Sequence, residues 1–205
     1  MGLKQDMKRA FAYAGWENFI DIIETGSHLP TMEFLMSLGI EDMITQLSEA
    51  LGFHKTCLLD PNALIKDHQY DRSTWWNSIS DEPVSSKNSI VSIHNPTLRL
   101  LAKWLSMVVH PRSDLRLYSS PELQCLLAMA HKIRFSPAVM SMLAHWQKMI
   151  ASKNPIDMTS LVTRIVAHVG ALENAQLTYL PSTEAFQFKI GREHFVQGHL
   201  MRGVV

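Results

Sequence analysis

The sequence contains little cysteine, and the little it has is not arranged for cross-linking. Only Cys57 and Cys125 occur among 205 residues, which excludes a framework of several disulfides and a four-cysteine zinc site. No run of 18 apolar residues is present, so we expect no membrane span. The polar stretch 1–9 lacks the hydrophobic region of a signal peptide. These absences predict an intracellular protein, in the nucleus or the cytoplasm, that is not secreted.

The chain also lacks an excess of charge of either sign. Lys and Arg together number 19, and Asp and Glu together also number 19, which argues against the strongly basic class of nucleic-acid or membrane-surface binders. The charges are nevertheless uneven: residues 1–50 hold three basic and eight acidic side chains, whereas residues 94–153 hold eight basic and two acidic ones. Three interpretations stay open: an anion-binding surface in the middle segment, head-to-tail pairing between copies, and two solvated faces of one fold.

Signatures of the common catalytic sites are missing as well. There is no Gly-x-Ser-x-Gly nucleophile turn, no Gly-rich phosphate loop of either common kind, no Asp-Asp pair and no zinc knuckle. The closest metal-like spacing, His54-x2-Cys57-x10-His68, lacks the second pair of ligands that tetrahedral zinc needs. We therefore predict a protein that is not an enzyme, with no cofactor, no metal and no small-molecule substrate.

Apolar residues recur at helical spacing over most of the chain, and several starts are marked by a capping residue with a proline in the first turn. The marked starts are Asn95-Pro96, Ser119 to Glu122 and Ser136-Pro137, and a fourth helix is expected from Asp157 to Gly170. Because each start precedes an apolar stripe and no strand pattern intervenes, residues 95–175 are predicted to form a block of four packed helices.

The first part of the chain shows weaker helical patterns. We expect a break at Gly15, because glycine costs about 1 kcal/mol in a helix interior, and a short helix near 43–51 that Gly52 ends. In residues 54–93 only Arg72 to Ile79 looks helical. Trp75 or Trp76 is expected to anchor this connection on the helical block.

These patterns together predict an all-α protein: a helical bundle with a long irregular connection and a short strand or helix at its C-terminus. We divide the chain into a loosely attached acidic helical front segment (1–53), an irregular connection with one short helix (54–94), the four-helix core block (95–175) and a tail packing on the core (176–205). The four parts are expected to form one structural domain. Twelve methionines fit either gap-filling in the core or an adaptable surface for self-association.

A set of short motifs follows in a fixed order along the chain. They are Gly15-Trp16 with Phe19, Thr31 to Leu38, Leu47 to Phe53, Trp76 with Ile79-Ser80, Ile93 to Arg99, Arg112, Glu122-Leu123, and the closing segment from Ile190 to Val205. In this order, and from about residue 3 to the end, the chain resembles the first-open-reading-frame protein of Athila-type plant retrotransposons. The most specific block is Ile93-His94-Asn95-Pro96-Thr97-Leu98-Arg99.

The resemblance implies a non-enzymatic, retrotransposon-derived protein that is at most an assembly or nucleic-acid-packaging component. Two departures imply an N-terminally shortened and degenerate copy: only Gly39 to Thr45 separates two motifs that the family spaces with a strand-like stretch, and the family's protein extends further upstream. The front half of the chain also resembles the plant mobile domain, a related architecture. That resemblance implies instead a nuclear interaction or regulatory module.

The helix expected after Asn95 carries a basic ridge opposite its apolar stripe. Its members, spaced four, three and four apart, are Arg99, Lys103, Ser106 and His110. Together with Arg112 and Arg116 from the following loop, Arg99 and Lys103 are the predicted contacts for the phosphates of weakly and non-specifically bound RNA or DNA. Two alternative interpretations remain: the ridge is an ordinary solvated helix face, or Arg99 pairs with an acidic residue of the front segment.

Overall fold

The computed structural model describes residues 2–21, 44–85, 88–109, 117–118, 120–137, 142, 159–168 and 170. Most of them are helical, which confirms the predicted all-α class. The elements in chain order are α1 (Leu3–Ala14), the 3₁₀ turn η1 (Phe19–Asp21), α3 (Ile44–Leu51), α4 (Pro61–Asp67), α5 (Arg72–Ile79), β1 (Asn88–Ser89), the 3₁₀ turn η2 (Ile90–Ser92), α6 (Pro96–Val108), β2 (Leu117–Tyr118), α7 (Ser120–His131) and α9 (Thr159–His168). None of the helices in these ranges combines the length and the apolar character that crossing a membrane requires.

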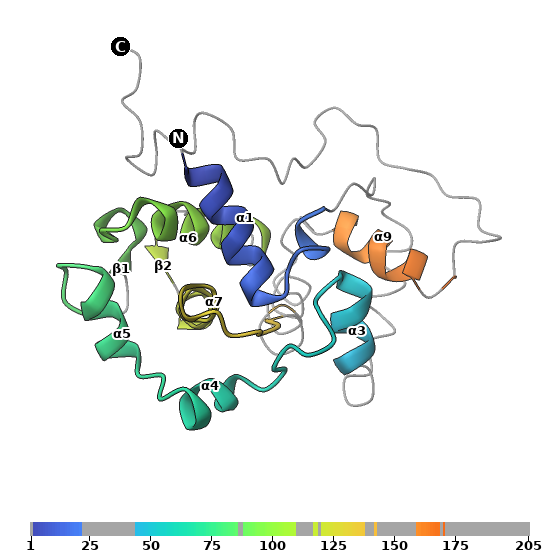
Figure 1. The fold of residues 1–205 in the computed structure, drawn as a ribbon, viewed down its shortest axis with the longest axis horizontal. Coiled ribbons are helices and arrows are strands. Elements are labelled where there is room, and N and C mark those ends of the chain that lie inside the picture. The colour runs from blue at the N-terminus through green and yellow to red at the C-terminus, as the bar shows by residue number, and fades with distance from the viewer. Residues whose placement is uncertain are drawn as a thin grey trace, which may run out of the picture.

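Helix α7 lies at the centre of the fold and is seen end-on in Figure 1. Helices α1, α5 and α6 pack against it, and α1 also contacts α6. Helices α3 and α9 form a second pair on the other side of the molecule (Figure 1). The two short strands β1 and β2 pair in antiparallel fashion, with Asn88 opposite Tyr118. The core is therefore built around α7 from segments that are far apart in the sequence.

Helix α1 ends at Ala14, and the helix is interrupted at Gly15 as predicted. Gly15 adopts a left-handed conformation with φ of 77°, and the N–H of Trp16 donates to the carbonyl of Phe11 (2.9 Å). This bond, five residues back, is the Schellman cap that a left-handed residue allows. Gly52 ends α3 in the same way with φ of 95°, which confirms the predicted stop there.

Five aromatic rings pack together beside the two helix caps at Gly15 and Gly52. The aromatic joint consists of Phe11, Trp16, Phe19, Phe53 and Trp104, and all five are buried. The rings of Phe19 and Phe53 stack with centroids 4.4 Å apart, and Phe11 meets Trp104 edge-on at 4.7 Å. The front segment was expected to be loosely attached, but α1 and the turn after it instead belong to the core, because their aromatic side chains fill the space beside α6.

The connection after residue 54 contains more helix than expected. Helix α5 has the predicted bounds, but α4 was missed. Asp60 caps α4 by accepting from the N–H of Asn62 (2.8 Å), and Pro61 occupies its first position. This is the same signal as Asn95-Pro96. A helix of seven residues shows too little apolar periodicity to be noticed, and only Leu64 of α4 is buried.

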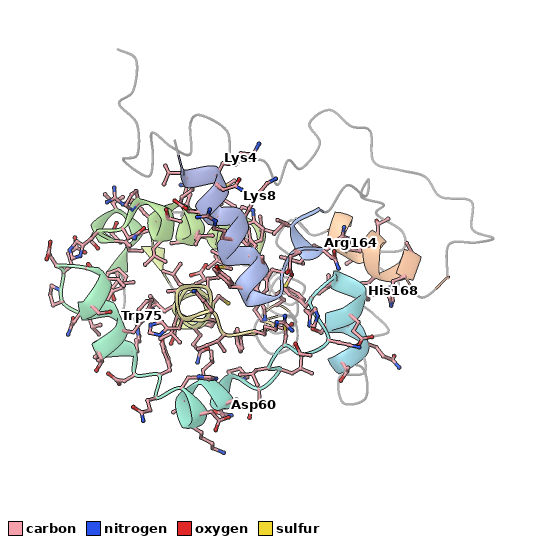
Figure 2. The ribbon with its side chains drawn as sticks, in the orientation of Figure 1. Lys4, Lys8, Asp60, Trp75, Arg164 and His168 are labelled. Carbon is pink, nitrogen blue, oxygen red and sulfur yellow. The ribbon has the colours of Figure 1, made fainter. Side chains whose placement is uncertain are left out.

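Both tryptophans of α5 anchor it, as predicted. The Trp76 side chain is fully buried, and its Nε1 donates to the carbonyl of Glu82 (2.8 Å). The Trp75 ring points toward α7 (Figure 2) and meets the His131 ring edge-on, with centroids 5.4 Å apart. Trp75 therefore attaches α5 to α7 through a ring contact, and Trp76 attaches α5 to the loop that follows it through a hydrogen bond.

The predicted four-helix block is only partly described. Helices α6, α7 and α9 are present, and Leu161, Val162 and Ile165 of α9 are buried as expected. The third predicted helix and the tail 176–205 lie outside the described residues, apart from the first two residues and Met142 of that helix. Among the described elements α9 packs mainly on α3. Arg164 of α9, which is labelled in Figure 2, donates to the carbonyls of Asn18 (2.7 Å) and Leu51 (3.2 Å). The block is thus interleaved with the front segment.

Candidate functional site

The predicted basic ridge of α6 is not an exposed surface. Lys103 is only 2% exposed and Ser106 is fully buried, and α6 packs against α1, α7 and η2. Lys103, one of the predicted nucleic-acid contacts, is therefore buried in this structure, and nucleic-acid binding itself stays a prediction. Helical spacing identified a shared face correctly, but it carried no information on which neighbours cover that face.

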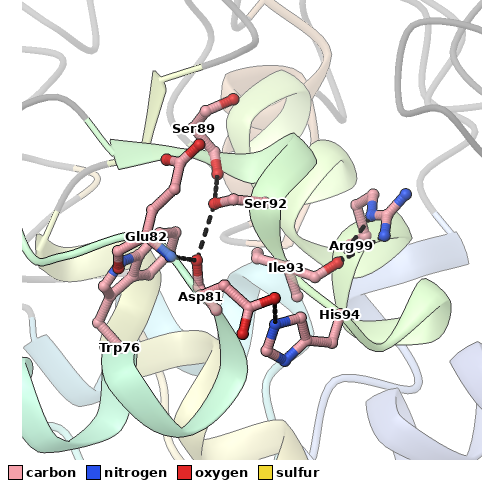
Figure 3. Close-up of polar contacts among 9 residues, drawn as sticks. Trp76, Asp81, Glu82, Ser89, Ser92, Ile93, His94 and Arg99 are labelled. Carbon is pink, nitrogen blue, oxygen red and sulfur yellow. Dashed lines mark hydrogen bonds and ion pairs between the residues drawn. The ribbon is translucent and has the colours of Figure 1, made fainter.

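Arg99 is half-buried and has a structural task. Its Nε and Nη2 both donate to the carbonyl of Ile93, at 2.9 and 2.7 Å, so the guanidinium fork clamps the turn that leads into α6 (Figure 3). His110, Arg112 and Arg116 lie outside the described residues.

A hydrogen-bonded joint connects α5 to α6 and is shown in Figure 3. The serine joint comprises Ser80, Ser89 and Ser92 together with the Arg99 clamp on Ile93 and the adjoining Asp81–His94 pair. In it the Ser80 hydroxyl donates to the Ser92 hydroxyl (2.9 Å), which donates to the Ser89 carbonyl (2.8 Å). Ser80 and Ile93 form an isolated antiparallel bridge. Residues of the motifs at Ser80 and at Ile93 therefore link the end of α5 to the turn that leads into α6.

The serine joint also contains a carboxylate–imidazole pair. His94 Nε2 lies 2.8 Å from Asp81 Oδ2, with the two side chains 49% and 93% exposed. Such a pair forms two thirds of a hydrolase triad, but Ser80 and Ser92 bond to each other and to backbone. In the described part of the chain, no serine hydroxyl is hydrogen-bonded to the His94 ring. The arrangement fits an exposed surface contact and gives no activated nucleophile.

The two cysteines are buried thiols. Burial raises the pKa of Cys57 to about 11, and burial raises the pKa of Cys125 well above its ordinary value, with the nearby Glu122 charge adding to the effect. Neither sulfur is a thiolate near neutral pH, so neither is suited to nucleophilic attack. Cys125 is fully buried and packs in the hydrophobic core.

The His54, Cys57 and His68 spacing does not assemble into a ligand set. Cys57 Sγ lies 3.4 Å from the Ala14 carbonyl, whereas His54 Nδ1 lies 2.9 Å from the Thr56 hydroxyl. Across the ranges that the structure describes, no three His, Cys, Asp or Glu side chains come close enough together to hold a metal ion.

Basic side chains do gather at one place that the sequence did not indicate. A pocket of about 490 Å³ opens between the loop after Phe53, the end of α4 and the C-terminal end of α7. It is lined by Thr56, Leu58, His68, Leu127, His131, Lys132, Ile133 and Arg134. Two of these side chains carry a permanent positive charge, two are imidazoles, and none is a carboxylate. We call this the basic pocket.

Backbone hydrogen bonds hold the walls of the basic pocket together. Leu58 and Phe135 form a parallel bridge, in which the N–H of Leu58 donates to the carbonyl of Arg134 (2.8 Å) and the N–H of Ser136 donates to that of Leu58 (2.9 Å). Arg134 Nη1 in turn donates to the Thr56 hydroxyl (2.7 Å). The guanidinium is therefore positioned by a neighbouring wall of the same pocket.

Lys132 occupies a backbone position that normally selects glycine. Its φ is 59°, and the N–H of Ile133 donates to the carbonyl of Ala128 (2.8 Å), so α7 ends in the same cap as α1 and α3. A side chain in this left-handed conformation costs about 1–2 kcal/mol. The ammonium lies 4.7 Å from the centre of the Tyr13 ring, a contact worth about 0.5–1 kcal/mol when exposed. The strain is thus only partly offset, and it sits in the wall of the basic pocket.

The sequence shows His131, Lys132 and Arg134 together at the end of α7, but it does not show that Thr56, Leu58 and His68 pack beside them to complete the pocket.

Comparisons of the chain with protein-family models, with curated proteins and with solved structures returned no match.

Proposed function

We propose that the protein is a non-enzymatic, retrotransposon-derived protein of the Athila type that serves as an assembly or nucleic-acid-packaging component. The observation that supports this most is the position of the motif residues in the fold. Gly15-Trp16, Gly52-Phe53 and Ile93 to Arg99 make helix caps, the aromatic joint and the serine joint. These motif residues have structural roles, as expected of a non-enzymatic protein whose motifs define its fold. Among the described residues, no cluster of reactive side chains accompanies them.

Contact with RNA or DNA is assigned to basic side chains of the middle segment. Lys103 no longer belongs to this set because it is buried, and Arg99 clamps the turn before α6, so Arg112 and Arg116 are the first residues to test. Binding is expected to be weak and non-specific, with dissociation constants on the order of 10⁻⁴–10⁻⁶ M at physiological salt.

The deciding experiment is a fluorescence-anisotropy titration of labelled single-stranded RNA and DNA with the intact chain over a series of salt concentrations. The double variant Arg112→Gln/Arg116→Gln should flatten the log–log salt slope by roughly 0.7–0.9 for each lost phosphate contact. Lys4→Gln/Lys8→Gln is the matched control, because it removes the same charge from exposed positions of α1 (Figure 2) in the acidic front segment. No binding at low salt, or equal effects of both variants, would contradict the assignment.

The retrotransposon origin has a separate test in the genome. Neighbouring reverse-transcriptase reading frames and long terminal repeats are the expected surroundings of the coding sequence. An isolated, transcribed single-copy gene would contradict the origin and favour the alternative, a nuclear interaction or regulatory module like the plant mobile domain.

A further inference from the structure

The basic pocket has the chemistry of an anion site. Lys132 and Arg134 bring two permanent positive charges, and His68 and His131 add two imidazoles that donate hydrogen bonds in either tautomer or when protonated. No carboxylate lines the pocket, so an entering anion meets no like charge in the wall. Its volume of about 490 Å³ lies within the range of small-ligand sites.

We propose that the basic pocket binds a phosphomonoester or inorganic phosphate dianion. A tetrahedral dianion matches donors that converge from several directions, and the Arg134 fork suits paired phosphate oxygens. Within the described residues only Nη1 of this guanidinium makes hydrogen bonds, to Thr56 and at 3.3 Å to His54. The opposite edge of the fork is therefore available to a ligand.

The end of a helix ordinarily disfavours an anion, because its last carbonyls carry partial negative charge. In the basic pocket this effect is reduced by backbone pairing. The carbonyl of Ala128 accepts from the N–H of Ile133 (2.8 Å), and the carbonyl of Arg134 accepts from the N–H of Leu58 (2.8 Å). The side-chain charges of Lys132 and Arg134 are whole charges, so they outweigh the remaining dipole.

Lys132 supplies a second, independent observation. Two other helices end in the same cap with glycine, at Gly15 and Gly52, whereas α7 uses a lysine with φ of 59°. The strain is retained at the cap that borders the basic pocket. Lys132 lines the pocket, and a positive charge in the wall of an anion site is a physical reason for a residue that the backbone disfavours.

This site goes beyond the proposed function, because its ligand is a terminal or free phosphate and not the backbone of a strand. The test is isothermal titration calorimetry of the full chain with inorganic phosphate, and then with a short oligonucleotide that carries either a 5′-phosphate or a 5′-hydroxyl. Arg134→Gln and Lys132→Gly should each weaken phosphate binding about tenfold, the effect of losing one charge-assisted hydrogen bond. Lys66→Gln is the matched control, because it removes one exposed positive charge from α4 outside the pocket wall.

The outcomes separate cleanly. Binding of inorganic phosphate that Arg134→Gln and Lys132→Gly weaken and Lys66→Gln leaves intact supports the site. If the 5′-phosphorylated strand then binds more tightly than the 5′-hydroxyl strand, the ligand is a strand end; if the two bind equally, the ligand is a free phosphate or small phosphomonoester. No heat with inorganic phosphate, or equal weakening by Lys66→Gln, overturns the site. Salt-dependent RNA binding that persists in the pocket variants would leave the proposed function standing when this site fails.

Discussion

The aromatic joint and the serine joint fasten the same helix, α6, by opposite chemistry. At the aromatic joint Trp104 of α6 meets Phe11 and Trp16 of the front segment through buried rings. At the serine joint the start of α6 is held by hydroxyl and carbonyl groups that lie within about 20 residues along the chain. One joint depends on removing apolar surface from water, and the other on hydrogen bonds that water can also make.

The difference predicts unequal costs of damage. Truncating a buried aromatic residue loses its transfer free energy and leaves a cavity, whereas a partly exposed hydrogen bond exchanges protein partners for water. The aromatic joint should therefore govern global stability, and the serine joint should govern only the local order of the α5–α6 connection. Four measurements test this comparison.

The largest expected effect is that of Trp16→Ala. Trp16 is fully buried, and its Nε1 donates to the Phe135 carbonyl at 2.6 Å. The substitution should lower the free energy of unfolding by about 3–5 kcal/mol, measured by urea denaturation followed by circular dichroism. Trp16→Phe, which keeps most of the ring but loses the donor, should cost less. A loss below about 1 kcal/mol for the alanine variant would show that the aromatic joint does not govern global stability.

Gly52→Ala should have the next largest effect. The left-handed conformation alone costs about 1–2 kcal/mol with a side chain present, and a Cβ at Gly52 would lie 2.9 Å from the backbone carbon of Asn18. The same denaturation measurement on Gly2→Ala is the control, because Gly2 has φ of −77° and its Cβ would meet only the Asp6 side chain. Equal stability of the two variants would mean that the cap after α3 does not constrain the aromatic joint.

Asn95→Ala probes the serine-joint side of the comparison. The Asn95 side chain accepts from the N–H groups of Thr97 (2.9 Å) and Leu98 (3.1 Å), and removing such a cap costs about 1 kcal/mol. Hydrogen exchange should show faster opening of the first turn of α6, with the exchange of α7 amides almost unchanged. Asn95→Asp keeps the acceptor and should behave like the natural chain. Faster exchange throughout α7 would show that the two joints are not energetically separate.

Lys132→Gly should give the smallest change, and one of opposite sign. Relief of the left-handed strain stabilises the chain, and loss of the contact with the Tyr13 ring removes part of that gain. The net increase in unfolding free energy is expected to be below about 1 kcal/mol, measured by the same urea titration. A decrease would mean that the Lys132 side chain stabilises the end of α7 more than its backbone strain costs.

Local signals in the sequence predicted local structure well. Asp71 caps α5 by accepting from the N–H of Thr74 (2.8 Å), and this hydrogen bond lowers the pKa of its carboxyl. The cap lies directly before Arg72, where the helix was expected to begin. Gly15 and Gly52 ended their helices where expected. These features depend on residues a few positions apart, which is the range that sequence patterns report.

The features that sequence analysis missed depend on distant neighbours. Helical spacing placed Lys103 on a solvated face of α6, but the Lys103 side chain is buried. The aromatic joint collects rings from Phe11 to Trp104, and the basic pocket joins Thr56 to Arg134. Nothing in the spacing of one segment shows which remote segment will pack against it, so the candidate site could only be found from the structure.

The contact between Trp16 and Phe135 also sets the order in which the fold can close during synthesis. The two residues are 119 positions apart, and chains grow at roughly 5–20 residues per second, so the ring waits roughly 6–24 seconds for its acceptor. During that interval the rings of the front segment have no completed core to enter, and exposed apolar surface of this kind attracts chaperones. A nascent chain arrested before Phe135 should therefore stay bound to a chaperone, and one arrested well beyond it should be released.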